Sequence, residues 1–176
     1  MLAVEPSDQG FLRGDNVVGN EVAELELKNC DPFQESADVM VNYTWDAQGH
    51  EFHSGRYSRY FEADNQILGN YQAWVRHFEK IEHGHCVVTQ GLSDERSEGK
   101  SLFIFHSIIP TFSQLNSESL EILQIGVANC LETANTLGAE SIALPLLGCD
   151  TEYDYPTRQA ISVILKIIKV WMDLKE

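Results

Sequence analysis

Two short stretches of the sequence hold the side chains that most readily do chemistry. The first, His83-Gly84-His85-Cys86, offers three candidate metal ligands within four residues. Consecutive donors of this kind rarely converge on one tetrahedral zinc ion, and the sequence has no paired CxxC or HxxxH spacing. We therefore expect turn and surface histidines here, and neither a bound metal nor another cofactor.

The second stretch is the loop Gly148-Cys149-Asp150. Cys149 would be a nucleophile if backbone N–H groups of a helix beginning at Thr157 lowered the pKa of its thiol. The alternative, which we prefer, is a small cysteine that only packs inside the loop. The sequence contains no Walker loop, GxSxG elbow or GxGxxG fingerprint, so these nucleotide-binding and nucleophilic signatures do not apply.

The segments that must position these residues alternate between strands and helices. Strands are predicted where apolar residues alternate or form short runs, at 21–28, 39–41, 86–89, 102–105 and 141–144. Helices are predicted where apolar residues recur every three or four positions, at 57–80 with a break near 64–65, at 118–137 and at 157–174. This order predicts an α/β fold, a three-layer α/β/α sandwich with a mixed, mostly parallel central sheet.

Ligands of such sheets bind where loops leave the carboxyl ends of the strands. This rule directs attention to the loops after Val41, Thr89 and Leu144. The chain of 176 residues shows no linker, so we expect one domain over 22–176 preceded by a tail or irregular edge segment over 1–21.

Composition narrows the partners and the compartment. The 27 acidic and 12 basic residues give a net charge of -15, which repels DNA and RNA but leaves room for a nucleotide held by backbone N–H groups. No apolar run is long enough to span a membrane, and the first 20 residues do not resemble a signal peptide. Four widely spaced cysteines show no disulfide framework, so we expect an intracellular protein of the cytoplasm or nucleus.

Three stretches taken together resemble the macro domain, a family that binds ADP-ribose and related nucleotides. Asp31, then six residues, then Asp38-Val39-Met40-Val41-Asn42 is similar to the family's Gly-Asp-Ile-Thr followed by Asp-Ala-Ile-Val-Asn. Residues 84–91 and 105–110 resemble the strand pair that ends in His-Ala-Val-Gly-Pro. Residues 138–148 are close to Ser-Ile-Ala-Phe-Pro and the loop that follows it. The resemblance covers residues 22 to 172, although 43–83 match poorly.

The resemblance implies roles for the matched positions. Asp31 would accept the adenine amino group, the alternative being a turn aspartate before a proline. Asn42 would lie near the distal ribose, the alternative being a hydrogen bond to the loop backbone. Gly55, Gly148 and Cys149 would belong to the phosphate loops. Tyr153 would cover the distal ribose, or else pack its loop against the last helix, and the same choice holds for Tyr155.

Several positions depart from the family pattern. Trp45 stands where the family has a second asparagine that positions the ribose for hydrolysis, and an indole cannot do this. Asp150 replaces a glycine beside the expected phosphates. Two unit charges about 4 Å apart cost roughly 1 kcal/mol in water and several times more at lower dielectric, so an inward Asp150 would lower affinity tenfold or more unless Arg56 or Arg59 offsets it.

One architectural departure concerns the centre of the sheet. Macro domains usually have an inner strand after the helix that corresponds to 157–174, yet this sequence stops at Glu176. Unpaired buried backbone groups cost roughly 1 to 3 kcal/mol each, so something must compensate. The segment around Val17 and Val18 could fill the space, or the strand over 21–28 could close up against its neighbour.

Three functions are therefore weighed. We expect a non-catalytic module that binds ADP-ribose or an ADP-ribosylated protein. The alternative is a macro fold that serves as a protein-interaction scaffold without nucleotide binding. An ADP-ribosyl hydrolase ranks third, because family analogy alone supports it.

Overall fold

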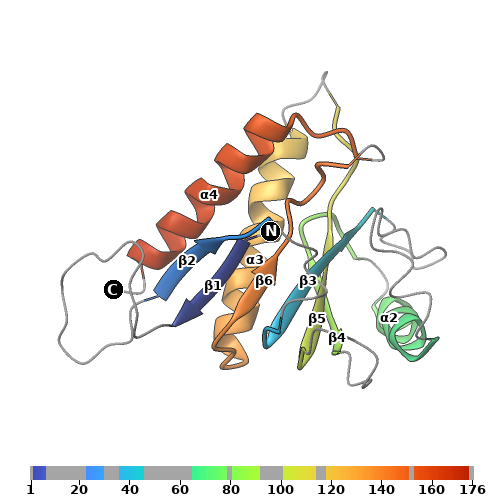
Figure 1. Cartoon of the computed structure of the whole chain (residues 1–176). Helices are drawn as coiled ribbons and strands as arrows, with labels where there is room; N and C mark the ends of the chain where they lie inside the picture. The colour runs from blue at the N-terminus through green and yellow to red at the C-terminus, as the bar shows by residue number, and fades with distance from the viewer. Residues whose placement is uncertain are drawn as a thin grey trace.

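In the computed structural model of this chain, a six-stranded sheet has the order β2-β1-β6-β3-β5-β4 (Figure 1). The structure describes residues 2–6, 23–29, 36–45, 65–78, 81–91, 101–113, 118–150 and 153–174. The strands are β1 Leu2–Pro6, β2 Ala23–Leu27, β3 Val39–Thr44, β4 Cys86–Gln90, β5 Phe103–Ile108 and β6 Ile142–Leu144. The helices within these ranges are α2 Asn65–His77, α3 Glu118–Thr136 and α4 Thr157–Asp173.

The centre of the sheet is parallel and both margins are antiparallel. Strand β3 pairs in parallel with β5 on one side and with β6 on the other. Strand β1 is antiparallel to β6 and to β2, and β4 is antiparallel to β5. Four strands, β2, β6, β3 and β5, therefore run in one direction. The predicted α/β fold with a mixed sheet is confirmed.

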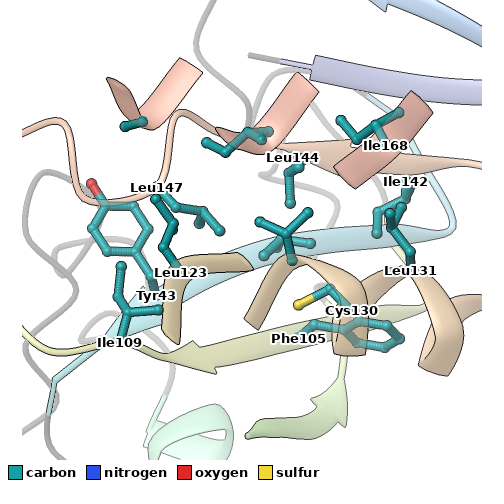
Figure 2. Packing of buried hydrophobic residues seen from close by; sticks show 14 of the residues in the cluster. Tyr43, Phe105, Ile109, Leu123, Cys130, Leu131, Ile142, Leu144, Leu147 and Ile168 are labelled. Carbon is teal, nitrogen blue, oxygen red and sulfur yellow. The ribbon is translucent and has the colours of Figure 1, made fainter. Parts of the chain in front are cut away.

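Helices cover both faces of the sheet, with α3 and α4 on one face and α2 on the other (Figure 1). Successive side chains of β3 point to opposite faces. Val39, Val41 and Tyr43 pack in the larger hydrophobic core with α3 and α4, which Figure 2 shows from close by. Met40 packs in the smaller core with Ile67, Tyr71 and Val75 of α2. Both faces of β3 are thus buried, as its apolar run predicted.

A glycine ends α3, the longest helix, one residue from the bound that the apolar spacing predicts. Gly138 follows α3 with φ +70°, and its N–H donates to the carbonyl of Asn135. The N–H of Ala139 donates to the carbonyl of Ala134 at 3.0 Å. These two bonds form a Schellman motif, which satisfies carbonyls that have no partner inside the helix. The chain then enters β6 after three residues.

Of the described helices, none is long and apolar enough to cross a membrane.

The beginning of the chain differs from the prediction. Residues 2–6 were expected in a tail or irregular edge segment, but β1 lies inside the sheet between β2 and β6. Pro6 pairs with β2 and lies beyond the residues of β1 that pair with β6. Its missing N–H therefore removes no hydrogen bond to β6. Strand β1 therefore provides backbone partners for both β2 and β6. Val17 and Val18, our first candidates, lie outside the described residues.

The place of the loop after Thr89, which was expected beside the loops after Val41 and Leu144, corrects a prediction. Strands 86–89 and 102–105 are neighbours as expected, and they are antiparallel, with Cys86 opposite Ser107 and Gln90 opposite Phe103. The sequence predicts no helix between them, whereas a parallel crossover usually contains an α-helix. The segment after Gln90 therefore leaves from the edge opposite to the ends of β3 and β6. Helix α2 begins at Asn65, and residues 57–64 of the predicted helical region lie outside the described ones.

Candidate functional site

The carboxyl ends of β3, β5 and β6 lie along one edge of the sheet because the three strands are parallel neighbours. Residue 45 leaves β3 there, residues 109–113 leave β5, and residues 145–150 leave β6. The N–H of Ile109 donates to the carbonyl of Thr44 at 2.9 Å, which fixes the first two exits beside each other. We call this margin, with its three exit segments, the carboxyl edge.

The loop after β6 is shaped by a glycine that no other residue can replace without strain. Gly148 has φ +73°, a conformation that L side chains rarely adopt. A Cβ on Gly148 would lie 2.5 Å from Cδ2 of Tyr155. The carbonyl of Gly148 accepts a hydrogen bond from the N–H of Tyr155 at 3.1 Å. The backbone and the tyrosine ring are thus in direct contact across the loop.

Asp150 joins this loop to the end of β3. One carboxylate oxygen accepts a hydrogen bond from the hydroxyl of Tyr43 at 2.6 Å, and the other accepts one from the N–H of Tyr153 at 3.1 Å. The rings of Tyr43 and Tyr153 meet edge to face with centroids 4.9 Å apart. Charged acceptors make shorter and stronger hydrogen bonds than neutral ones. We call this contact the Tyr43–Asp150 latch.

Tyr155 joins the same loop to the exit of β5 and to α3. Its hydroxyl lies 2.9 Å from the carbonyl oxygen of Pro110 and 3.1 Å from that of Ser119, so its single proton is shared between these two acceptors. Burial raises the pKa of this hydroxyl, which therefore stays protonated as a donor. The N–H of Phe112 donates to the carbonyl of Tyr153 at 2.7 Å. Two of the three exit segments are thus hydrogen-bonded to each other.

Cys149 lacks the environment of a nucleophile. Burial raises the pKa of its thiol, and the negative charge of Asp150 raises it further. The thiol is half-buried and lies 3.7 Å from the carbonyl oxygen of Leu147. A raised pKa lowers the fraction of reactive thiolate at neutral pH. Both effects oppose the activated-nucleophile alternative and favour the cysteine that packs inside the loop.

Asn42 points to the opposite face from Tyr43 and belongs to a buried polar network under α2. Its amide nitrogen lies 3.2 Å from Nδ1 of His106, and Nε2 of His106 lies 2.8 Å from the hydroxyl of Thr89. Burial lowers the pKa of His106 to about 3, so the ring is neutral. The edge of the Tyr71 ring faces it at 5.1 Å. Among the described residues, the amide oxygen of Asn42 has no hydrogen-bond partner.

The structure thus brings together four of the residues that the sequence singled out. Gly148, Cys149, Asp150 and Tyr153 lie in one loop at the carboxyl edge, whereas Asn42 lies on the α2 face. The ring of Tyr153 is fully buried, which favours the packing alternative over a cover for a ribose. Asp31, Gly55, Arg56 and Arg59 lie outside the described residues.

Sequence reasoning missed Tyr43 and underrated Tyr155. Tyr43 stands 107 positions from Asp150, so no local pattern links the two. A weak signal was available, because Tyr43 follows Asn42 in a strand and must point to the other face of the sheet.

Within the described ranges, no three His, Cys, Asp or Glu side chains gather as a metal site. The first histidine stretch forms a turn, in which Nδ1 of His85 accepts from the N–H of Glu82 at 3.2 Å.

An α/β/α sandwich whose loops meet at the carboxyl edge of a mixed sheet defines a class of proteins that bind ligands over strand ends. Residues 62–164 match the family model of the Macro domain. Because this match spans more than half of the sequence, the chain belongs to the macro domain family.

Solved structures of macrodomains share the fold. The Oceanobacillus iheyensis macrodomain with ADP is 19% identical, with a TM-score of 0.66, over 98% of this chain and 83% of that chain. A variant of that macrodomain with ADPR is 21% identical, with a TM-score of 0.65, over 81% of this chain and 75% of the other. The macrodomain of Mycobacterium tuberculosis DarG is 13% identical, with a TM-score of 0.64, over 83% and 90%. No curated protein matches the sequence.

Proposed function

We propose that this macro domain binds ADP-ribose, free or attached to a protein, at the carboxyl edge and does not hydrolyse it. The observation that carries the proposal is the loop after β6. It is held in a left-handed turn at Gly148 and hydrogen-bonded to the ends of both β3 and β5. A loop fixed before binding loses little conformational entropy when a ligand arrives. Macrodomains of the same fold have been solved with ADP and with ADPR.

The charge of Asp150 weakens this binding without preventing it. Both carboxylate oxygens already accept hydrogen bonds from Tyr43 and Tyr153, so the charge is partly neutralised inside the protein. The remaining repulsion acts on the diphosphate of the ligand. We therefore expect a micromolar dissociation constant, and an Asp150→Asn variant that binds ADP-ribose about tenfold more tightly.

The absence of hydrolysis in this proposal rests on Trp45. It is the first residue after β3, at the position where family members have an asparagine tied to hydrolysis. An indole has one N–H donor and no acceptor, so it cannot orient an attacking water by accepting its proton. Incubation with an ADP-ribosylated protein should release no ADP-ribose. Release that is lost in Asn42→Ala would instead establish the hydrolase.

Calorimetric titration with ADP-ribose tests the binding proposal. We expect saturable, one-to-one binding that is lost in Asp31→Ala, because this carboxylate is proposed to accept the adenine amino group. Asp173→Ala is the matched control, since this exposed aspartate ends α4 at the far end from the loop, about 25 Å away for a helix of this length. No heat at millimolar ADP-ribose would end the proposal and leave the interaction scaffold.

The proposed setting is intracellular. Cys86, Cys130 and Cys149 are free thiols, which suits a reducing compartment. The net charge of -15 disfavours DNA and RNA as partners and still allows a nucleotide or an ADP-ribosylated protein that is held by backbone N–H groups.

A further inference from the structure

Helix α3 packs closely on the end of β5 and the start of β4. A Cβ on Gly126 would lie 2.7 Å from Oγ of Ser107, so α3 could not approach β5 this closely with a side chain at that position. The amide of Asn129 donates a hydrogen bond to the carbonyl of Gly84 at 2.8 Å, which ties the next part of α3 to the turn before β4. These two contacts hold one stretch of the helix against both strands.

Two cysteine thiols face each other at this contact. Cys86 is opposite Ser107 in the antiparallel register of β4 and β5, so the two side chains share one face of the sheet. Cys130 follows Gly126 by one helical turn and therefore lies on the same side of α3. It belongs to the larger hydrophobic core, and Cys86 packs against that core. The thiols are thus neighbours, although they come from distant parts of the sequence.

The surroundings of Cys86 favour a bond between the two sulfur atoms. A hydrogen bond to the Cys130 thiol raises the pKa of the Cys86 thiol well above its usual value, and burial raises it further. A disulfide requires Cα atoms roughly 4.4 to 6.8 Å apart, and the close approach at Gly126 brings α3 toward the sheet as such a bond needs. Cys149 offers a contrast, because the neighbour that its thiol contacts is the carbonyl oxygen of Leu147.

Cys86 is the thiol that an oxidant reaches first, because it is partly exposed whereas Cys130 is buried. Its strand, β4, is the outermost of the described strands on that side of the sheet. The thiolate of Cys86 attacks one oxygen of hydrogen peroxide, the O–O bond breaks, and the products are a sulfenic acid and water. Cys130 then attacks the sulfenic sulfur, an S–S bond forms, and a second water leaves. The two thiols lose two electrons and two protons in total, and the peroxide accepts them.

We propose that Cys86 and Cys130 form a reversible oxidation site, at which a peroxide converts the two thiols into a disulfide that links β4 to α3. This site goes beyond the proposed binding of ADP-ribose and does not depend on it. The first step is slow at neutral pH, because the thiolate and not the protonated thiol is the nucleophile. A small thiol reverses the reaction by exchange with the disulfide.

Peptide mapping by mass spectrometry tests the link. The reduced full chain is incubated with hydrogen peroxide, the remaining thiols are alkylated in denaturant, and the protein is digested without a reductant. We expect a peptide pair linked through Cys86 and Cys130 that is about 2 Da lighter than its two reduced peptides together and that disappears after treatment with dithiothreitol. Cys149→Ala is the matched control and should form the same link, whereas Cys86→Ala should leave Cys130 open to alkylation.

Thermal unfolding shows whether the disulfide fits the folded protein. The bond closes a long loop between β4 and α3, so the linked wild type should unfold roughly 5 to 10 °C higher than the reduced protein, and Cys86→Ala should show no such shift. An unchanged or lower unfolding temperature of the linked protein would overturn the proposal. The proposal would also fail if prolonged oxidation left Cys130 open to alkylation, or linked either thiol to another cysteine.

Discussion

The two faces of β3 use polar side chains in contrasting ways. On the α2 face, Asn42 and His106 form a fully buried network in which every group is neutral. On the other face, Tyr43 reaches the carboxylate of Asp150, which is partly open to solvent and beside a glycine turn. The two side chains are neighbours in sequence, and strand geometry alone separates them.

This difference separates the parts of the structure that support the fold from those that shape the site. A buried neutral network gives a unique arrangement to a core. A charged latch at a loop controls where backbone groups and charge lie at the surface. We infer that changes on the α2 face act on stability, whereas changes at the latch act on both stability and ligand binding.

The largest expected effect comes from Gly148→Ala. The new Cβ would meet the Tyr155 ring at 2.5 Å, at a residue with φ +73°. The left-handed conformation costs roughly 1 to 2 kcal/mol and overpacking a further 1 to 3 kcal/mol or so, so unfolding in urea should show a loss of roughly 2 to 5 kcal/mol.

Gly138→Ala is the control for the contact with the ring. Gly138 has φ +70°, but a Cβ there would meet nothing within 4 Å. Its loss should be about 1 kcal/mol, the conformational part alone. Equal losses in both variants would show that the Tyr155 contact does not hold the loop.

The second effect is a pH dependence that belongs to the α2 face. Burial lowers the pKa of His106 to about 3 in the folded protein, from 6.5. The unfolded chain then binds a proton between these values that the folded chain does not, so stability is complete above about pH 6.5 and falls as the pH is lowered. Between pH 7 and pH 5, this residue should cost about 2 kcal/mol.

Chemical unfolding at the two pH values, compared between wild type and His106→Gln, measures that cost. The variant should lose about 2 kcal/mol less than the wild type on acidification. Thr89→Val, which removes a hydrogen-bond partner but keeps the buried ring, should retain the wild-type dependence. A wild type and His106→Gln with the same dependence would contradict the neutral buried state.

The smallest effect is expected from Tyr43→Phe, which removes the hydroxyl from the Tyr43–Asp150 latch. A hydrogen bond to a charged group contributes roughly 1.5 to 3 kcal/mol, and water replaces part of it because Asp150 is partly exposed. We expect a loss of about 1 kcal/mol in urea unfolding. A double-mutant cycle with Asp150→Asn should give a coupling of similar size, and a coupling near zero would show that the two side chains act independently.

Sequence patterns predicted the elements well because those patterns are local. The apolar spacing located α3 and α4, and it placed the end of α3 within one residue of Thr136. Strand β1 was missed because Leu2, Ala3 and Val4 are followed at once by Glu5 and Pro6, and only pairing with distant strands on both sides defines it. The loop after Thr89 was wrongly grouped with the loops after Val41 and Leu144, because spacing along the chain does not give the direction of β4.

The candidate site was predicted in part. The loop after β6 was found from its residues and from the resemblance to the family. The role of Asp150 was not predicted. An acid beside the expected phosphates suggests repulsion of the ligand, whereas in the structure its carboxylate oxygens accept hydrogen bonds from residues 43 and 153. Such a contact depends on how separate strands come together, which spacing along the chain does not encode. Asn42 remains a predicted ligand contact, but its amide lies under α2.

The central claim is that a nucleotide binds at the carboxyl edge of the sheet. A titration of ¹⁵N-labelled protein with ADP-ribose, followed by NMR, tests it most directly. The account predicts saturable shifts of the backbone amides of Gly148, Cys149 and Asp150, and little change at Gly91 and Leu102 on the opposite edge. Shifts confined to the opposite edge, or none at millimolar ADP-ribose, would contradict it.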